Sequence, residues 1–212
     1  TWNGWKPTAK TVRRARSLVL SERQGGTLNA EAVADGVIQK IAKEGIESLP
    51  WTEQLQRLRA RISFLKRQSK ENTPDLCDLT LAQTAREWLI PFISADGKDA
   101  VTEDILRTAL NALIGWDLLP RLDSLVPEHL ILPSGSSRPV DYESGEIPVL
   151  AARLQEFFGC TATPEICGIP LLLHLLSPAG RPVQVTRDLD GFWDRAYPDV
   201  KKELAGRYPK HY

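Results

Sequence analysis

Residues 171–186 constrain the fold more than any other stretch of the chain. Leu171 to Leu176 form an apolar run that is too short to span a membrane and too hydrophobic for a surface loop, which predicts a strand buried on both faces or nearly so. Ser177 to Gly180 suits a tight reversal that closes a hairpin with a bulge. Residues 183–186 then return with strand-like alternation. Because an isolated hairpin is marginal in water, other parts of the chain must cover its leucines.

The charge balance excludes a protein that binds nucleic acid through an overall basic excess. The 27 Lys and Arg residues equal the 27 Asp and Glu residues in number, so an electrostatic partner has to be bound by a local patch. A chain of 212 residues can bury one large core or two modest ones.

Cysteine usage and hydropathy favour a cytoplasmic protein. Cys77, Cys160 and Cys167 have no C-x-x-C spacing, so we expect ordinary thiols in a reducing compartment rather than disulfides or a zinc site. No apolar run reaches the length of a membrane helix, and no signal peptide opens the chain. The sequence contains no methionine, even at position 1, and we therefore expect it to be part of a longer protein.

Residues 28–126 have the periodicity of a helical region. The expected helices run from Ala30 to a stop at Gly45, from Thr52 as N-cap through residues 53–70, and from a capping box that begins at Thr80. A further helix follows Thr102, where acidic residues of the first turn complement the helix dipole.

Residues 127–212 predict an α+β module. A first hairpin is expected over 129–142, then a helix from Pro148 to Phe158, the hairpin of residues 171–186, and a short helix from Pro198 to Gly206. The predicted fold class is therefore α+β: an N-terminal helical bundle, then a small antiparallel sheet of two hairpins covered by helices. Residues 1–27 form a lead-in with one or two strands, whose partners we expect upstream of Thr1.

The sequence shows no catalytic, cofactor-binding or metal-binding constellation. It has no phosphate-binding loop, no G-x-G-x-x-G and no nucleophile elbow. His129, His174 and His211 lack metal-ligand spacing, and His174 is interpreted as a hydrogen-bonded core residue. Asp188 and Asp190 could act as an acid–base pair, but beside a hairpin end they more simply cap the next segment of the chain.

Two cationic segments are candidates for nucleic-acid contact. The helix at 53–70 could follow a phosphate backbone. The C-terminal segment interleaves cations with aromatic residues, which suits phosphate attraction and base stacking on a single strand; these aromatic residues are Phe192, Trp193, Tyr197, Tyr208 and Tyr212. The candidate residues are Arg57, Arg59, Arg61, Lys66 and Lys70 in the helix at 53–70, and Arg187, Arg195, Lys201, Lys202, Arg207 and Lys210 towards the C-terminus. The alternative is a solvated or internally paired charged face, with Phe192 and Trp193 in the core, and for these two rings we favour the core.

Several segments resemble one family of helicases. The matching stretches are RLQEFFG at 153–159, PLLLHLLSPAGRPVQVTRDLDGFW at 170–193, VKKELAGRYPKH at 200–211, LPSG at 132–135, LPW at 49–51 and LRARISFLKRQ at 58–68. Together they resemble the C-terminal region of the bacterial ATP-dependent helicases of the HrpB family.

This resemblance implies a DEAH-type superfamily 2 parent, with two RecA-like motor domains, a winged helix and a helical domain upstream. None of the motor motifs lies in this chain, so ATP and Mg²⁺ are expected only on the upstream motor, and no cofactor in this segment. We expect a non-catalytic accessory segment that docks on the motor in cis and contacts single-stranded RNA or DNA. Contact with a protein partner is also compatible with the resemblance, and the alternative function is a protein-interaction module without nucleic-acid binding.

Overall fold

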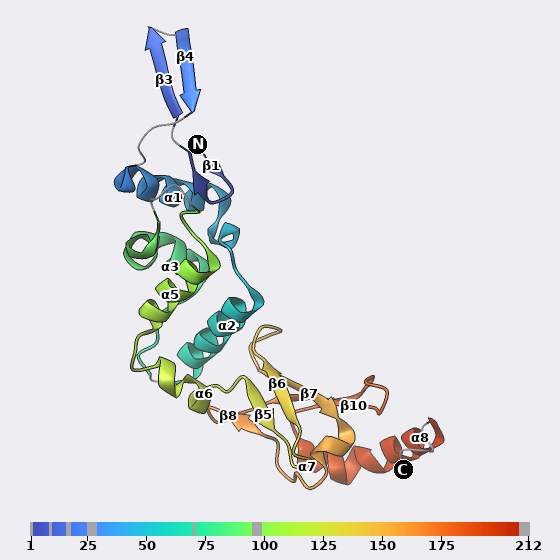
Figure 1. The fold of residues 1–212 in the computed structure, drawn as a ribbon. Helices are drawn as coiled ribbons and strands as arrows, with labels where there is room; N and C mark the ends of the chain where they lie inside the picture. The colour runs from blue at the N-terminus through green and yellow to red at the C-terminus, as the bar shows by residue number, and fades with distance from the viewer. Residues whose placement is uncertain are drawn as a thin grey trace. The chain divides into compact units, whose positions relative to one another are not determined.

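A computed structural model of the chain describes residues 2–8, 10–15, 18–24, 29–69, 71–94 and 99–207. The chain divides into two compact units, of which unit 1 comprises residues 1–59 and 73–119, and unit 2 comprises residues 60–72 and 120–212 (Figure 1). The boundaries predicted after residues 27 and 126 stay predictions. None of the described helices is long and apolar enough to cross a membrane.

Unit 1 begins with two pairs of antiparallel strands. Strand β1 (Trp2–Asn3) pairs with β2 (Lys6–Pro7), and β3 (Lys10–Ala15) pairs with β4 (Leu18–Gln24). These strands pair with each other within the chain, and the expectation that upstream sequence completes this lead-in stays a prediction.

The two longest predicted helices of unit 1 are confirmed. Helix α1 (Ala30–Glu44) ends at Gly45, whose φ of 84° favours glycine, and α5 (Glu103–Ile114) is capped by the Thr102 hydroxyl, which accepts from the Ile105 N–H at 3.3 Å. Val37 and Ile41 of α1 and Leu106 and Leu110 of α5 are among the residues buried in the core of the unit. The one-turn helix η1 (Ile46–Ser48) follows α1, and α2 (Glu53–Gln68) contributes residues 53–59 to unit 1 and residues 60–68 to unit 2.

The helix predicted to start at Thr80 begins earlier and is interrupted. Helix α3 (Asp78–Gln83) is capped by Cys77, whose sulfur accepts from the Thr80 N–H, and α4 (Ala85–Trp88) and η2 (Ile90–Phe92) follow. The capping box is therefore wrong, because Thr80 lies within the first turn of α3. The Thr80 carbonyl accepts a hydrogen bond from the hydroxyl of Thr84, the residue that separates α3 from α4.

Unit 2 is built on a five-stranded sheet with the order β11-β10-β7-β6-β5 (Figure 1). Its strands are β5 (His129–Ile131), β6 (Ser137–Asp141), β7 (Val149–Arg153), β10 (Leu172–Leu176) and β11 (Pro182–Thr186). The short elements η3 (Leu119–Arg121) and α6 (Leu122–Leu125) precede the sheet, and β8 (Glu165–Ile166) pairs with β9 (Ile169–Pro170) beside it. The α+β class and both predicted hairpins are confirmed.

The segment predicted as a helix over 148–158 is instead the central strand of the sheet. Strand β7 pairs with β6 in an antiparallel manner and with β10 in parallel, so the sheet is mixed rather than wholly antiparallel. Leu150 and Ala152 are buried while Ala151 and Arg153 are exposed, which is the two-residue period of a strand. Only the following 3₁₀ turn, η4 (Leu154–Phe157), is helical, because pairing on both sides overrides the helix-like spacing of the apolar residues.

The hairpin of β10 and β11 closes as its sequence predicts. Gly180 has a φ of 76°, its N–H donates to the Ser177 carbonyl at 2.9 Å, and the register shifts between Leu175 and Leu176. Only one face of β10 is fully buried, through Leu173 and Leu175, while the other face is partly exposed. The prediction of burial on both faces is corrected accordingly.

The last helical segment of the described chain starts earlier than predicted. It consists of α7 (Leu189–Gly191), one π-helical turn η5 (Phe192–Ala196) and α8 (Tyr197–Arg207). Pro198 is the second residue of α8 rather than the start of the helix. Leu189, Phe192 and Leu204 are buried, so this segment supplies part of the core of unit 2.

Truncation of the buried face of β10 tests this arrangement. We expect Leu173→Ala to lower the free energy of unfolding by about 2–5 kcal/mol, because Leu173 is fully buried and its truncation leaves a cavity. Val185→Ala, at a position 47% exposed on β11, serves as the matched control and should cost less than about 1 kcal/mol. Urea denaturation followed by circular dichroism measures both, and equal losses would contradict the packing described.

Candidate nucleic-acid interface

Arg59 of α2 has its charge satisfied inside unit 1. Its guanidinium lies 4.4 Å from the centre of the Trp51 ring, donates to the Leu76 carbonyl at 2.9 Å and pairs with Asp78 at 2.6 Å. The side chain is only 17% exposed. Its contacts connect the middle of α2 to the start of α3, so Arg59 is better assigned to the stability of unit 1 than to phosphate contact.

Arg61 has a comparable internal role in unit 2. The side chain is buried, Nε donates to the Val126 carbonyl at 2.7 Å, and Nη1 donates to Glu128 at 3.0 Å. Nη2 also pairs with Asp123. The guanidinium therefore connects α2 to α6 and to the segment that leads into β5, which leaves little of its charge for a phosphate.

The other candidates in α2 are exposed. Arg57 is 55% exposed and pairs with Glu53, one turn earlier, at 3.3 Å, and Lys66 is exposed in the second half of the helix. Lys70 lies outside the described residues. Sequence periodicity alone could not separate Arg57 and Lys66 from Arg59 and Arg61, because the partners of the latter come from distant segments.

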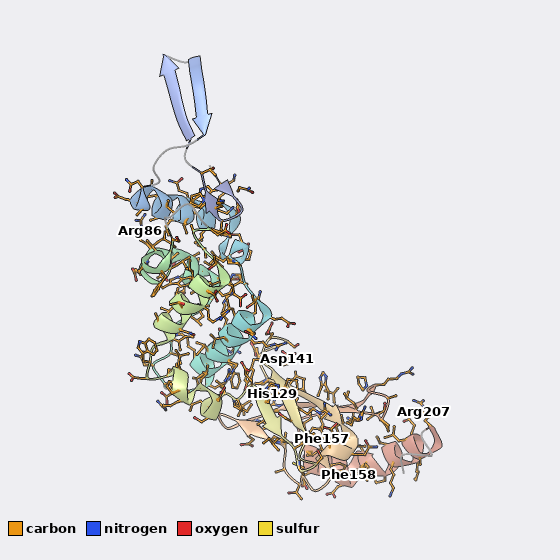
Figure 2. The ribbon with its side chains drawn as sticks, viewed as in Figure 1. Arg86, His129, Asp141, Phe157, Phe158 and Arg207 are labelled. Carbon is orange, nitrogen blue, oxygen red and sulfur yellow. The ribbon has the colours of Figure 1, made fainter. Side chains whose placement is uncertain are left out.

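The C-terminal candidates are exposed on or just before the last helical segment. Three of them form ion pairs: Arg195 with Asp188 at 2.7 Å, Lys202 with Asp199 at 3.5 Å, and Arg207 with Glu203 at 3.1 Å. Such exposed pairs are weak and screened by salt, so a phosphate can replace the carboxylate at little cost. Figure 2 shows Arg207 near the far end of α8.

Lys201 and Arg187 have no ion pair within the part of the chain that the structure describes. Lys201 is exposed on α8, and the Arg187 Nε donates to the Pro170 carbonyl at 3.4 Å. Lys210 lies outside the described residues, as do Tyr208 and Tyr212. We call Arg187, Arg195, Lys201, Lys202 and Arg207 the tail cations.

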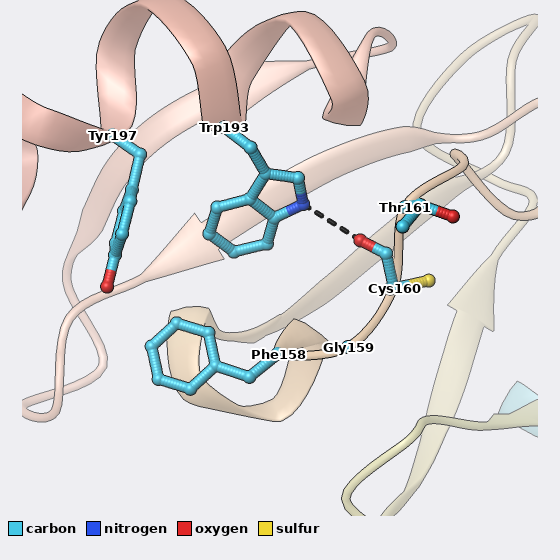
Figure 3. Close-up of a pocket in the computed structure, with 6 residues that line it drawn as sticks. All are labelled: Phe158, Gly159, Cys160, Thr161, Trp193 and Tyr197. Atoms are coloured by element: carbon cyan, nitrogen blue, oxygen red, sulfur yellow. Dashed lines mark hydrogen bonds between the residues drawn. The ribbon is translucent and has the colours of Figure 1, made fainter.

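An aromatic cluster lies beside the tail cations. The ring centroids of Trp193 and Tyr197 are 5.0 Å apart at an interplanar angle of 82°, and Phe158 lies 5.9 Å from Trp193 and 6.1 Å from Tyr197. With residues 159–161 these rings line a cavity of about 350 Å³, which we call the aromatic pocket (Figure 3). Phe192 is buried, as its sequence context predicts, whereas Trp193 is only partly buried.

The sequence pattern does not single out Phe158, because the spacing over 148–158 predicts a helix in which Phe158 is one of several apolar residues. It is 44% exposed, while its neighbour Phe157 is fully buried. The glycine after the two phenylalanines is the available signal that the chain turns at this point. Gly159 adopts a φ of 88°, a conformation that favours glycine, directly after the 3₁₀ turn η4 and its C-cap Phe158.

A partly buried ion pair holds the turn that carries Phe158. Arg138 on β6 donates to both carboxylate oxygens of Glu156 at 2.7 Å, and these hydrogen bonds lower the pKa of the Glu156 carboxyl to about 2. The same carboxylate accepts from the Arg153 N–H at 3.2 Å and from the Ser136 hydroxyl. Glu156 thereby connects β6 and its preceding turn to η4, two residues before Phe158.

The remaining candidate groups among the described residues are metal ligands and the Cys160 thiol of the aromatic pocket. Within the described ranges there is no group of three or more His, Cys, Asp and Glu residues that could hold a metal ion. His174 lies partly exposed on β10. Burial raises the pKa of the Cys160 thiol, which disfavours the thiolate that nucleophilic catalysis requires.

Comparison with known proteins assigns the chain to a family. The family described as "ATP-dependent helicase C-terminal" matches residues 88–212. The chain belongs to the HrpB C-terminal family. This confirms the resemblance found in the sequence.

Relatives cover almost the whole chain. The ATP-dependent RNA helicase HrpB of Escherichia coli K12 is 35% identical to this chain over 217 residues, which represent 99% of this chain and 27% of that protein. Two solved structures are also similar. The crystal structure of the E. coli DExH-box NTPase HrpB has a TM-score of 0.78 and 32% identity, and that of the E. coli DEAH/RHA helicase HrpB has a TM-score of 0.72 and 30% identity. Each match covers 98% of this chain and 28% of the solved one, so the chain spans about a quarter of the length of these relatives.

Arg61 and Arg57 of α2 provide a test of the difference between a buried and an exposed arginine. We expect Arg61→Ala to lower the free energy of unfolding by about 2–4 kcal/mol, because it removes charged hydrogen bonds and the packing of a buried side chain. Arg57→Ala, four residues earlier in the same helix, should change it by no more than about 0.5 kcal/mol. Chemical denaturation of both variants measures the difference, and comparable effects would contradict the internal role of Arg61.

The Arg138–Glu156 pair predicts a pH-dependent contribution to stability. Because folding lowers the pKa of the carboxyl from 4.5 to about 2, the contribution is present above roughly pH 4.5 and is lost as the pH falls towards 2. We expect wild type to exceed Glu156→Gln in unfolding free energy by about 1.5–3 kcal/mol at pH 7, and by progressively less on acidification. The exposed Glu165 on β8 provides the control variant Glu165→Gln, and urea titrations at pH 7 and pH 2.5 measure all three proteins. A difference that does not shrink at low pH would refute the assignment.

Proposed function

We propose that this chain is the accessory C-terminal segment of an HrpB-type ATP-dependent RNA helicase, that it is not catalytic by itself, and that it docks on the motor domains and contacts single-stranded nucleic acid. The observation that carries the nucleic-acid contact is the placement of exposed cations beside partly exposed aromatic rings on one helical segment. Cations and π-faces together bind single strands with little sequence preference.

Docking on motor domains in cis is supported by the length of the relatives, because this chain matches only part of each. It corresponds to 27% of a protein named as an ATP-dependent RNA helicase, and its family is described as a C-terminal part. We place ATP and Mg²⁺ on motor domains outside this chain, since its sequence carries no phosphate-binding loop. The cytoplasmic location indicated by the sequence stays a prediction.

The alternative function is a protein-interaction module that does not bind nucleic acid. It is favoured by the pairing of Arg195, Lys202 and Arg207 with carboxylates and by the net charge of zero. Large apolar side chains are also exposed, among them Ile131 on the edge strand β5, at 80%. This alternative predicts association with a protein that is insensitive to salt and no retention on nucleic acid.

A titration of the chain with labelled single-stranded oligouridine RNA at two salt concentrations distinguishes the two functions. We expect binding at 50 mM salt that weakens about 100-fold at 200 mM, because five tail cations that contact phosphates give a slope of log K against log salt near −3.5. Replacement of two of them, by Lys201→Ala with Lys202→Ala, should reduce the magnitude of the slope by about 1.4.

Lys43 of α1 provides the matched control, because it is an exposed lysine outside the tail cations. We expect Lys43→Ala to leave both the affinity and the slope unchanged. The absence of binding at low salt would remove nucleic-acid contact from the proposal and favour the interaction module.

A further inference from the structure

We propose that the aromatic pocket formed by Phe158, Trp193 and Tyr197 holds one unstacked base of a single-stranded nucleic acid. This inference rests on the function proposed above and adds the specific site for the base.

The geometry of the pocket suits a flat aromatic ligand. Trp193 and Tyr197 stand nearly perpendicular to each other, at 82°, and Phe158 faces both from a different segment of the chain (Figure 3). A base that enters the space can stack on one ring while its edge meets another, the arrangements that aromatic groups prefer. The volume of the aromatic pocket, about 350 Å³, lies near the lower end of the range for small-ligand cavities.

The partial exposure of Phe158 leaves ring surface that an occupant of the pocket can contact. Large rings normally supply buried area, and the chain does bury Phe157 completely. Phe158 is instead 44% exposed, although the Arg138–Glu156 ion pair fixes the turn that carries it. The ring is thus held in place against Trp193 and Tyr197 with part of its surface open to a ligand.

Trp193 is oriented by a hydrogen bond and by an unusual helical turn. Its Nε1–H donates to the Cys160 carbonyl at 2.8 Å, so the polar edge of the indole is satisfied (Figure 3). The ring also packs against Phe192, at 5.1 Å between centroids, and is only partly buried, so part of its surface is left for stacking. The residue lies in the π-helical turn η5, and single π turns within helices occur frequently at functional sites.

A phosphate next to the bound base would meet Lys201. Because Lys201 follows Tyr197 by four residues, it lies one turn further along the same face of α8, about 6 Å along the helix axis. Arg195 lies on the same segment, paired with Asp188, and the exposed carboxylates of Asp190 and Asp194 offset part of the positive charge. Stacking rather than charge must therefore provide most of the affinity of the pocket itself.

The presence of both aromatic rings and neighbouring cations favours a base over a peptide as the occupant. A nucleic acid uses both parts of the surface at once, with its base on the rings and its phosphates on Lys201 and the other tail cations. An apolar peptide would use the rings alone and would leave the exposed cations next to them without a role.

The test compares two single-stranded oligonucleotides of equal length, an oligouridine and an abasic strand with the same number of phosphates. Fluorescence anisotropy with the 212-residue chain at low salt should show that the oligouridine binds about 5- to 150-fold more tightly, the range that corresponds to stacking of one base. Raising the salt should weaken both complexes in parallel and leave this ratio nearly unchanged.

Phe158→Leu keeps an apolar side chain but removes the ring, and we expect it to bring the ratio close to one. Trp116→Leu is the control, because Trp116 is 83% exposed in unit 1, outside the pocket, and the ratio should be unaffected. Circular dichroism of each variant verifies folding, and Tyr197→Leu provides a second pocket variant with the same expected result.

Two outcomes would overturn the inference in distinguishable ways. Equal, salt-dependent binding of both oligonucleotides to the wild-type chain would assign the pocket to another occupant, such as a protein, and would leave nucleic-acid contact by the cations intact. Failure of both oligonucleotides to bind at low salt would overturn the proposed nucleic-acid contact together with the pocket.

Discussion

The parallel pairing of β7 with β10 is the interaction on which the rest of unit 2 depends. It joins the two hairpins into a single mixed sheet, in which Leu150 of β7 and Leu173 of β10 are register partners and are both fully buried. A parallel pair needs a long connection, and residues 154–171 supply it. That connection contains Phe158 and Cys160, whose carbonyl accepts the hydrogen bond from the Trp193 Nε1–H. The connection required by the parallel pair therefore also supplies part of the lining of the aromatic pocket.

Internal and external uses of positive charge are separated within the chain. Arg59 and Arg61 hold distant segments together, and Arg138 fixes the Glu156 turn, whereas the tail cations are exposed and are paired with nearby carboxylates or with none among the described residues. A protein with zero net charge can in this way stabilise its core with some arginines and still offer a local cationic surface. The proposed nucleic-acid contact uses only the second group.

Local signals in the sequence predicted the parts of the fold that local interactions determine. The Thr102 cap of α5, the Gly45 stop of α1 and the bulged turn at Gly180 depend on neighbouring residues, and each was predicted correctly. The strand β7 was predicted as a helix because its apolar spacing fits both periods, and only its two sheet partners decide between them. The burial of Arg61 and the pocket around Phe158 likewise depend on residues far apart in the sequence, and so could not be inferred from spacing.

In the proposed function, the aromatic pocket and the tail cations form one continuous surface for single-stranded nucleic acid. Photocrosslinking with 4-thiouridine-substituted RNA, with mass spectrometry of the crosslinked peptides, tests it most directly. We expect crosslinks concentrated in residues 158–161 and 193–201. Crosslinks confined to other segments of the chain would contradict the claim.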